Sequence, residues 1–217
     1  MAGTDAVAII GLGRFGRSVA LELMAHGTDV LGIDHRPQVV QALDGRLTYV
    51  VTADATDEQV LRELSVPDFD RVVVAIGSDV GMSVLTTSLL LRFGIPQIWA
   101  EAVSEAHGTI LDQLGIRHVV FPEADMGRRT AHLVSGSVLD YSQIGGDFAV
   151  VETTPHRAIR SIPLQQAGIL DRYGVQVVAV RKATGAWHFV TPQTVLEADD
   201  TVLVAGPAAS VERFDRL

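Results

Sequence analysis

The chain contains no cysteine among its 217 residues. This absence excludes a disulfide framework, a thiolate metal site and a cysteine nucleophile. Positive charge is also scarce, because 17 Lys and Arg residues stand against 26 Asp and Glu residues and the net charge at pH 7 is −9. An acidic chain is a poor candidate for general binding to nucleic acid or to an anionic membrane, so we expect no nucleic-acid partner.

Long apolar runs are missing as well. The stretch 84–91 is interrupted by Thr and Ser and bounded by Arg92, and no run reaches the ~20 residues that span a bilayer. Residues 1–5 lack the basic and apolar regions of a signal peptide. We therefore expect a soluble, cytoplasmic protein.

Common catalytic signatures are absent too. The chain has no GxSxG motif, no HExxH motif and no Walker lysine, and its seven histidines form no HxH or HxxxH pair. These absences favour nucleotide binding without turnover over catalysis, so we expect a protein that is not an enzyme.

The most informative segment is 7–16, Val-Ala-Ile-Ile-Gly-Leu-Gly-Arg-Phe-Gly, an apolar strand-like run that meets three glycines before an amphipathic helix. In a dinucleotide-binding fold Gly11 allows the tight turn, Gly13 lets backbone N–H groups approach a pyrophosphate, and Gly16 lets the helix lie close to the sheet. Asp34 ends the next apolar run, where a carboxylate can accept hydrogen bonds from ribose hydroxyls. It also disfavours the 2′-phosphate of NADP, despite the nearby Arg36. This context predicts a site for an adenosine-type nucleotide.

Strand-like and helix-like segments alternate six times over about 140 residues. Strands are expected at 7–10, 30–33, 47–52, 71–76, 97–100 and 118–121, and the last helix at 124–139. The alternation predicts an α/β fold with a Rossmann-like, doubly wound parallel sheet, in which ligands bind at the carboxyl ends of the strands. The residues expected at those ends are Gly11–Gly16, Asp34, Asp54, Gly77, Glu101 and Glu123.

The pattern changes near Tyr141. Strands are expected at 148–153, 175–181, 187–190 and 201–205, with a hairpin turn at 183–185, a short helix at 162–170 and a closing helix at 208–216. We therefore expect a nucleotide-binding domain with a crossover helix at 1–140 and a small α+β domain at 141–217.

Several motifs occur in a characteristic order, namely Ile10–Gly16, Ala53–Asp57, Val74–Gly77, Leu85–Thr87 with Ile98–Trp99, and Phe121–Gly127. Together they resemble the cytoplasmic regulatory subunits of bacterial Ktr/Trk potassium-uptake systems, the Ktr branch especially, along essentially the whole chain. The Pro-Glu-x-Asp-Met-Gly motif and the Arg-Phe pair inside the glycine loop are the most specific of these motifs.

The resemblance implies an N-terminal and a C-terminal RCK domain, joined by a crossover helix at 125–139. It also implies dimers that assemble into an octameric ring, held at the inner face of the cell membrane by a potassium-translocating subunit of the KtrB or TrkH kind. The implied ligands are ATP and ADP, with NAD and NADH as further candidates. Their exchange would change the ring's conformation and bias the transporter gate.

The resemblance also implies which residues form the site. The glycines would face the phosphates, Asp34 the ribose, and Asp54 and Ala55 the adenine. The full expected set is Gly11, Gly13, Arg14, Phe15, Gly16, Asp34, Asp54, Ala55, Ala75, Ile76, Gly77 and Glu101.

Two side chains have sharper implied roles. Arg14 would reach the terminal phosphate of a nucleotide across the dimer interface, and a guanidinium that grips a γ-phosphate loses that contact with ADP. The alternative is a solvated residue at a helix start. Glu123 would hold a divalent cation or sodium near the phosphates, and the alternative is a carboxylate favoured by the helix dipole.

Two positions depart from the family pattern. Relatives often carry a basic residue where this chain has Glu101, and a carboxylate there weakens direct polyphosphate binding unless a cation intervenes. Glu101 is therefore either a second cation ligand or a sign of altered nucleotide preference. Leu170 stands where a basic residue is expected in relatives that bind cyclic di-AMP, so binding of that ligand is disfavoured.

Two other functions are weighed against the gating subunit. The first is a small NAD-dependent oxidoreductase, which predicts redox change at a nicotinamide. The second is a redox-sensing DNA-binding regulator, which the acidic balance and the lack of a basic recognition helix disfavour.

Overall fold

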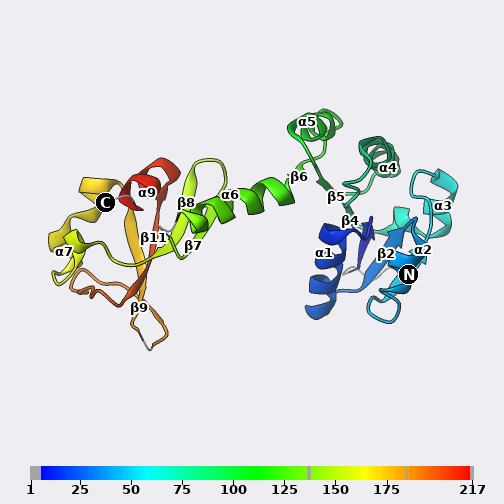
Figure 1. Cartoon of the computed structure of the whole chain (residues 1–217). Helices are drawn as coiled ribbons and strands as arrows, with labels where there is room; N and C mark the ends of the chain where they lie inside the picture. Colours follow the sequence, from blue (N-terminus) through cyan, green and yellow to red (C-terminus); the bar gives the residue numbers. More distant parts are fainter. Residues whose placement is uncertain (1–5, 136–137, 184, 216–217) are drawn as a thin grey trace. The chain divides into compact units, whose positions relative to one another are not determined.

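The computed structural model describes residues 6–135, 138–183 and 185–215 (Figure 1). The chain divides into two compact units, Met1–Glu123 and Ala124–Leu217. The predicted turn at 183–185 and the end of the predicted helix at Arg216 lie partly outside the described residues. Among the described residues, no helix combines the length and the apolar character needed to cross a bilayer.

Six parallel strands form the sheet of the first unit in the spatial order β3-β2-β1-β4-β5-β6. They are β1 (Val7–Ile10), β2 (Val30–Asp34), β3 (Tyr49–Thr52), β4 (Arg71–Val74), β5 (Gln97–Glu101) and β6 (His118–Val120). Ile10 pairs with Ile33 of β2 and with Val74 of β4, so these three strands end together. The chain adds β2 and β3 on one side of β1 and then crosses back to add β4 on the other side. Doubly wound sheets bind ligands at this switch point. The predicted fold class is confirmed.

Helices cover both faces of this sheet. They are α1 (Arg14–Ala25), α2 (Pro37–Gln41), α3 (Glu58–Glu63), α4 (Val80–Phe93) and α5 (Glu105–Gln113), with a 3-10 turn, η1 (Val66–Asp68). Successive residues of β1 point to opposite faces, so Ile9 packs in one core with Ala20 of α1 while Ile10 packs in another with Leu61 of α3 and Leu90 of α4. A strand that is buried on both faces needs the continuous apolar run that the sequence shows.

Polar caps mark the starts of three helices. The side chains of Asp57, Asp79 and Ser104 each accept a hydrogen bond of 2.8–3.2 Å from a backbone N–H in the first turn. Such caps satisfy amide groups that have no partner within the helix. They place α3, α4 and α5 directly after the carboxyl ends of β3, β4 and β5.

Helix α6 (Pro122–Val134) begins earlier and ends earlier than the predicted helix at 124–139. A proline fits the first helical position because its fixed φ suits the helix and its missing N–H needs no partner. The sequence Ser-Gly-Ser at 135–137 has poor helix propensity, which explains an earlier end, although 136–137 lie outside the described residues. In the second unit, Arg129 of α6 forms a bidentate ion pair with Asp140, with N···O distances of 2.9 and 2.8 Å.

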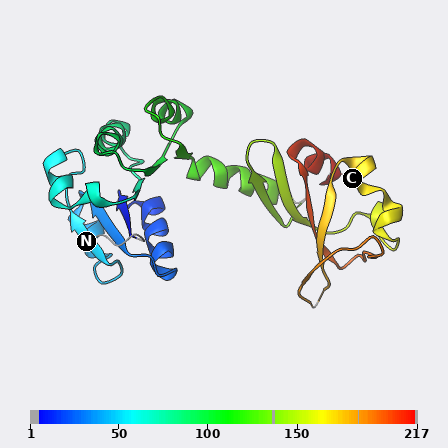
Figure 2. The same ribbon diagram turned by 180° about the vertical axis from the view of Figure 1, so that it is seen from behind.

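The second unit is built on a five-stranded antiparallel sheet in the order β10-β9-β11-β8-β7 (Figure 2). Its strands are β7 (Asp140–Ile144), β8 (Phe148–Thr153), β9 (Gln176–Arg181), β10 (Trp187–Phe189) and β11 (Thr201–Pro207). Its helices are η2 (Arg157–Ile159), α7 (Leu164–Ala167), α8 (Ile169–Tyr173) and α9 (Ala208–Asp215). Strand β7 was not predicted. The predicted helix at 162–170 is instead two short helices, because Gly168 between them has φ of +56°.

Candidate nucleotide-binding site

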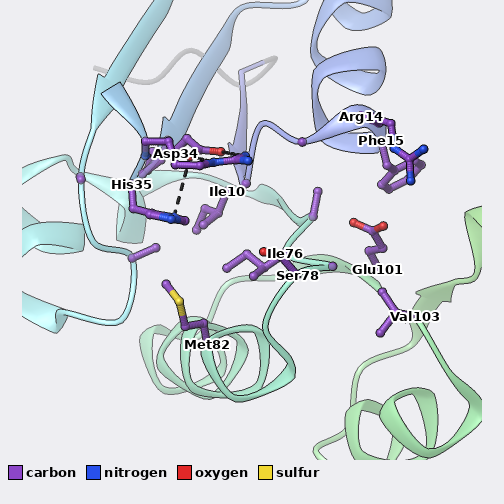
Figure 3. Close-up of a pocket in the computed structure, with 18 of the residues that line it drawn as sticks. Ile10, Arg14, Phe15, Asp34, His35, Ile76, Ser78, Met82, Glu101 and Val103 are labelled. Carbon is purple, nitrogen blue, oxygen red and sulfur yellow. Dashed lines mark hydrogen bonds and ion pairs between the residues drawn. The ribbon is translucent and has the colours of Figure 1, made fainter. Parts of the chain in front are cut away.

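A pocket of about 360 Å³ opens at the carboxyl ends of β1, β2, β4 and β5 (Figure 3). This is the edge of the sheet at which the sequence predicts a single site. The predicted site residues that line it are Gly11, Gly13, Arg14, Phe15, Asp34, Ala55, Ala75, Ile76, Gly77, Glu101 and Glu123. The fold therefore gathers eleven residues, spread over more than 100 positions of the sequence, around one cavity.

Two predicted site residues do not line the pocket. Gly16 lies beneath it, where a Cβ would overlap the Gly11 carbonyl oxygen and come within 2.8 Å of the Ala75 Cβ. Asp54 is exposed and accepts hydrogen bonds from the Thr56 hydroxyl (2.7 Å) and backbone N–H (2.8 Å), which hold the pKa of its carboxyl below the ordinary value. Asp54 therefore shapes the turn that presents its neighbour Ala55 to the pocket.

The glycine loop brings the start of α1 to the pocket. Gly11 has φ of +92°, a conformation that strongly favours glycine. Gly13 is the N-cap of α1 and supplies no capping side chain, and a Cβ built on it would meet no atom within 4 Å. The first turn of α1 also carries no acidic residue. Uncapped amide groups at the positive end of a helix form a site suited to an anion such as phosphate.

Asp34 lies at the end of β2, where its carboxylate connects β2 to the glycine loop. Its buried carboxylate accepts hydrogen bonds from the Leu12 N–H (2.8 Å) and from the backbone and guanidinium of Arg36 (2.9–3.0 Å). Burial acts to raise the pKa of Asp34, but these hydrogen bonds and the charge of Arg36 outweigh burial, so the pKa is lowered. The carboxylate is therefore ionised at neutral pH and ties β2 to the glycine loop.

Glu101 is the buried charge at the other end. It ends β5, is only 5% exposed, and points toward the side of the pocket where Arg14 lies (Figure 3). Burial and the negative charge of Glu123 raise the pKa of its carboxyl, and Arg14 offsets part of this effect. Arg14 and Glu123 form a loose ion pair at 3.8 Å, and the Arg14 side chain is 96% exposed.

Apolar side chains occupy the middle of the pocket. Ile10, Ile76 and Met82 lie between Asp34 and Glu101 (Figure 3). An apolar slot with polar groups at both ends is typical of sites for small ligands with a flat ring and charged substituents. The pocket thus has an apolar centre and, beside it, the glycine loop at the start of α1.

Sequence reasoning missed part of the lining. His35, Ser78, Met82 and Val103 contribute to the wall, and Arg36, noted only as a neighbour of Asp34, grips it. A signal existed, because His35 is the first residue after β2 and Val103 is the second residue after β5. Met82 is three residues after the cap of α4, and its side-chain direction follows from the helix and not from a motif.

Comparison with known proteins places the whole chain. Residues 7–122 match the TrkA-N domain and residues 149–217 match the TrkA-C domain. The chain is 34% identical over 212 residues to Ktr system potassium uptake protein C of Bacillus subtilis, covering 96% of this chain and 95% of the relative. It is 32% identical over 209 residues to Ktr system potassium uptake protein A of the same organism, covering 96% and 94%. The chain belongs to the Ktr/Trk family. The resemblance inferred from its motifs is confirmed.

Solved structures agree on the fold of this Ktr/Trk family member. The RCK domain of GsuK superposes with a TM-score of 0.65 at 18% identity, covering 98% of this chain and 47% of that chain. The GsuK channel bound to NAD gives 0.63 at 18% identity, covering 98% and 39%. The chain thus spans less than half the length of these structures, and at this identity the likeness establishes the RCK fold alone.

Proposed function

We propose that the chain is the nucleotide-binding gating subunit of a potassium-uptake transporter and that it has no enzymatic activity. The observation that carries the proposal is the pocket at the switch point of the sheet, lined by the glycine loop, in a chain that matches Ktr system potassium uptake proteins over nearly its full length. The partner is then a potassium-translocating membrane subunit, which holds the chain at the inner face of the membrane.

The pocket's chemistry supports an adenine nucleotide as the ligand. The phosphates face the uncapped start of α1 at Gly13, where helix amides favour an anion. The base lies in the apolar slot formed by Ile10, Ile76 and Met82, and the ribose lies toward Asp34. A channel of the same fold is bound to NAD in its solved structure, so dinucleotides belong in the test beside ATP and ADP.

The exposure of Arg14 supports a role for this residue in binding the terminal phosphate of the nucleotide. Its guanidinium is almost fully exposed, and its ion pair with Glu123 is long at 3.8 Å, so it can turn to a phosphate on its own or a neighbouring subunit. A bidentate contact with a γ-phosphate is lost when ADP replaces ATP. Exchange of the two nucleotides would then shift an octameric ring between two shapes, since a ligand moves an equilibrium only through its different affinity for the two states.

Calorimetric titration of the nucleotide-stripped protein tests this function. ATP, ADP, AMP, NAD, NADH and cyclic di-AMP are titrated with magnesium, and light scattering reports the mass of the assembly. Binding of ATP and ADP by a ring, with no change in NADH absorbance when candidate substrates are added, supports the proposal. Binding of NADH alone, or its oxidation by a substrate, overturns it in favour of a dinucleotide sensor or an oxidoreductase.

Gating itself needs a transport measurement. Potassium flux is followed in vesicles that carry a Ktr-type membrane subunit, with the chain and either ATP or ADP. A nucleotide-dependent difference in flux supports the gating role. Equal flux with either nucleotide and without the chain contradicts it.

A further inference from the structure

The Leu-Thr-Thr motif at 85–87 lies on α4, and the proposed function does not use it. Thr86 and Thr87 are both 0% exposed. The Thr86 hydroxyl donates a buried hydrogen bond of 3.2 Å to the Ala55 carbonyl oxygen, 31 residues away in the sequence. Within the described part of the chain, the Thr87 hydroxyl has no hydrogen-bond partner. The two threonines are therefore equally buried, but only the Thr86 hydroxyl makes a specific contact with another segment.

The acceptor of this hydrogen bond belongs to the wall of the pocket. Ala55 lines the pocket, is only 5% exposed, and lies in the turn 53–57 between β3 and α3. The Ala53 N–H donates to the Asp34 carbonyl oxygen at 3.1 Å, which connects this turn to β2. The Thr86 hydroxyl connects the same turn to α4. The turn is thus held from two sides, by a strand and by a helix.

Helix α4 carries another part of the wall. Met82 points from α4 into the pocket (Figure 3) and lies four residues before Thr86, so both side chains lie on the same face of the helix. The hydrogen bond of Thr86 therefore fixes the position of Ala55 relative to Met82, and both of these residues line the pocket. A slot that is already held at the right width loses little conformational freedom when a flat ring enters it.

We propose that Thr86 is a positioning residue for the nucleotide. Its hydroxyl holds the turn at Ala55 against α4 and so sets the width of the slot that receives the adenine base. The proposal rests on the nucleotide-binding function proposed above. In the described structure Thr86 does not line the pocket, so it acts through Ala55 and Met82 and not by touching the ligand. Loss of the hydroxyl should then weaken the binding of the base and leave the binding of phosphates unchanged.

Thr86→Val tests this by removing the hydroxyl while nearly keeping the shape of the side chain. The Ala55 carbonyl oxygen then loses its donor, so the turn is free to shift. We expect calorimetry on the full chain to show that ATP and adenosine bind this variant roughly tenfold more weakly than the wild-type chain, the equivalent of one hydrogen bond. Inorganic tripolyphosphate, measured by its competition with ATP, should bind with unchanged affinity because it has no base.

Thr87→Val is the matched control. Thr87 is the next residue of the same helix, is equally buried, and has a hydroxyl without a partner among the described residues. This variant should bind ATP within about twofold of the wild-type chain and should melt at or above the wild-type temperature, because it removes an unpartnered buried hydroxyl. Thr86→Val should melt at a lower temperature, because it leaves a buried acceptor without its donor.

Two further substitutions separate the hydroxyl from the shape of the side chain. Thr86→Ser keeps the hydroxyl and should restore ATP affinity to nearly the wild-type value. Thr86→Cys supplies the weaker S–H donor, so its ATP affinity should fall between those of Thr86→Ser and Thr86→Val. The comparison of Thr86→Ser with Thr86→Cys remains measurable if Thr86→Val does not fold.

Two failures are distinguishable. If neither ATP nor adenosine binds the wild-type chain, the proposed function fails. If ATP binds the wild-type chain and binds Thr86→Val equally well, the nucleotide site stands and the positioning role of Thr86 is overturned. Equal weakening of ATP and tripolyphosphate by Thr86→Val also overturns this role, because it would show general damage to the pocket and not a change in the slot for the base. Failure of Thr86→Ser to restore ATP affinity overturns it as well.

Discussion

The Arg36 guanidinium forms a bidentate contact with both oxygens of the Asp34 carboxylate. Nε donates to Oδ1 and Nη2 donates to Oδ2, each at 3.0 Å, while the Arg36 and Leu12 backbone N–H groups donate at 2.9 and 2.8 Å. A carboxylate offers about four lone-pair positions, so these four hydrogen bonds use all of them. The residue expected to bind ribose hydroxyls is therefore already satisfied by the protein.

Removing the Arg36 guanidinium should reveal a preference for ribose. In the wild-type chain we expect ATP and 2′,3′-dideoxy-ATP to bind with similar affinity, because Asp34 has no acceptor left for the hydroxyls. Arg36→Ala frees two acceptor positions, so the ratio of the two affinities should rise about tenfold, the equivalent of one hydrogen bond to a charged group. Calorimetric titration of both nucleotides measures the ratio.

Arg36→Ala also removes a positive charge, but this loss weakens ATP and 2′,3′-dideoxy-ATP alike. It therefore cancels in the ratio of the two affinities. Arg46→Ala is the control, since Arg46 is exposed and does not line the pocket. A strong preference for ATP already present in the wild-type chain would contradict the prediction. It would show that Arg36 moves aside when the nucleotide binds.

Arg14 should distinguish ATP from ADP. Its side chain is 96% exposed and its ion pair with Glu123 is long, so Arg14→Ala should change the free energy of unfolding by less than about 0.5 kcal/mol. Loss of a bidentate contact with the γ-phosphate should weaken ATP binding about tenfold and leave ADP binding nearly unchanged. Titrations of both nucleotides and a urea melt measure these quantities.

Arg17→Ala is the matched control for Arg14, one turn further along α1, exposed and outside the pocket lining. If Arg14→Ala weakened the binding of ATP and of ADP equally, the proposed contact between Arg14 and the γ-phosphate would be contradicted. Equal effects of the two substitutions would point to general electrostatic attraction instead.

The pocket's location was predictable from local patterns. The sequence alone shows apolar runs that end in glycines or are followed by polar residues. A parallel sheet then brings the residues at the ends of these runs to one edge, here Gly11, Asp34, Gly77 and Glu101. The hydrogen-bond partners and the burial of these side chains were not predictable. Whether Asp34 accepts bonds from ribose or from Arg36 depends on the course of the turn after β2. The surroundings of Glu101 depend on a distant segment, since Gly77, which follows β4, lies against its carboxylate.

The misses in the fold have the same physical origin. Strand β7 (Asp140–Ile144) reads Asp-Tyr-Ser-Gln-Ile, with a single buried residue, Tyr141, so it carries little of the alternation that marks a strand. It forms because it pairs with β8 in a hairpin, with Ile144 opposite Phe148. Pairing of this kind is decided by the partner and the turn, which a single-strand pattern does not contain.

Acid should weaken the fold through Asp34. Because the folded state lowers the pKa of Asp34 from its ordinary value of 3.8, the unfolded chain binds the proton more readily. The stabilisation is therefore complete above pH 3.8 and is lost as the pH falls through the lower folded-state pKa. Asp34→Asn should cost about 1–3 kcal/mol at pH 7, because Arg36 and the Leu12 N–H lose a charged acceptor.

Urea melts of the wild-type chain and Asp34→Asn between pH 7 and pH 3 measure this. Other carboxylates titrate in both proteins, so the difference between the two isolates Asp34. That difference should be constant down to about pH 4 and shrink below it. A difference that stays constant over the whole range would contradict the role of the ionised carboxylate.

Two glycines of the same loop should respond in opposite ways to alanine. A Cβ on Gly16 would overlap the Gly11 carbonyl oxygen, a backbone atom that cannot move without shifting β1 or α1, so Gly16→Ala should cost about 3 kcal/mol of stability. A Cβ on Gly13 meets no protein atom within 4 Å, and the backbone there has φ of −66°, which alanine adopts. Gly13→Ala should therefore cost less than about 1 kcal/mol, the price of a poorer N-cap.

Gly13→Ala should nevertheless lower nucleotide affinity about tenfold or more, because its methyl group fills the space through which phosphates approach the amides of α1. Thermal melts and ATP titrations of both variants separate the two effects, and Gly127→Ala, another glycine with open space around it, is the control for binding. If Gly13→Ala bound ATP as the wild-type chain does, the phosphates could not lie against the start of α1. The nucleotide would then have to enter the pocket from the Asp34 side, and the assignment of the anion-binding end would be reversed.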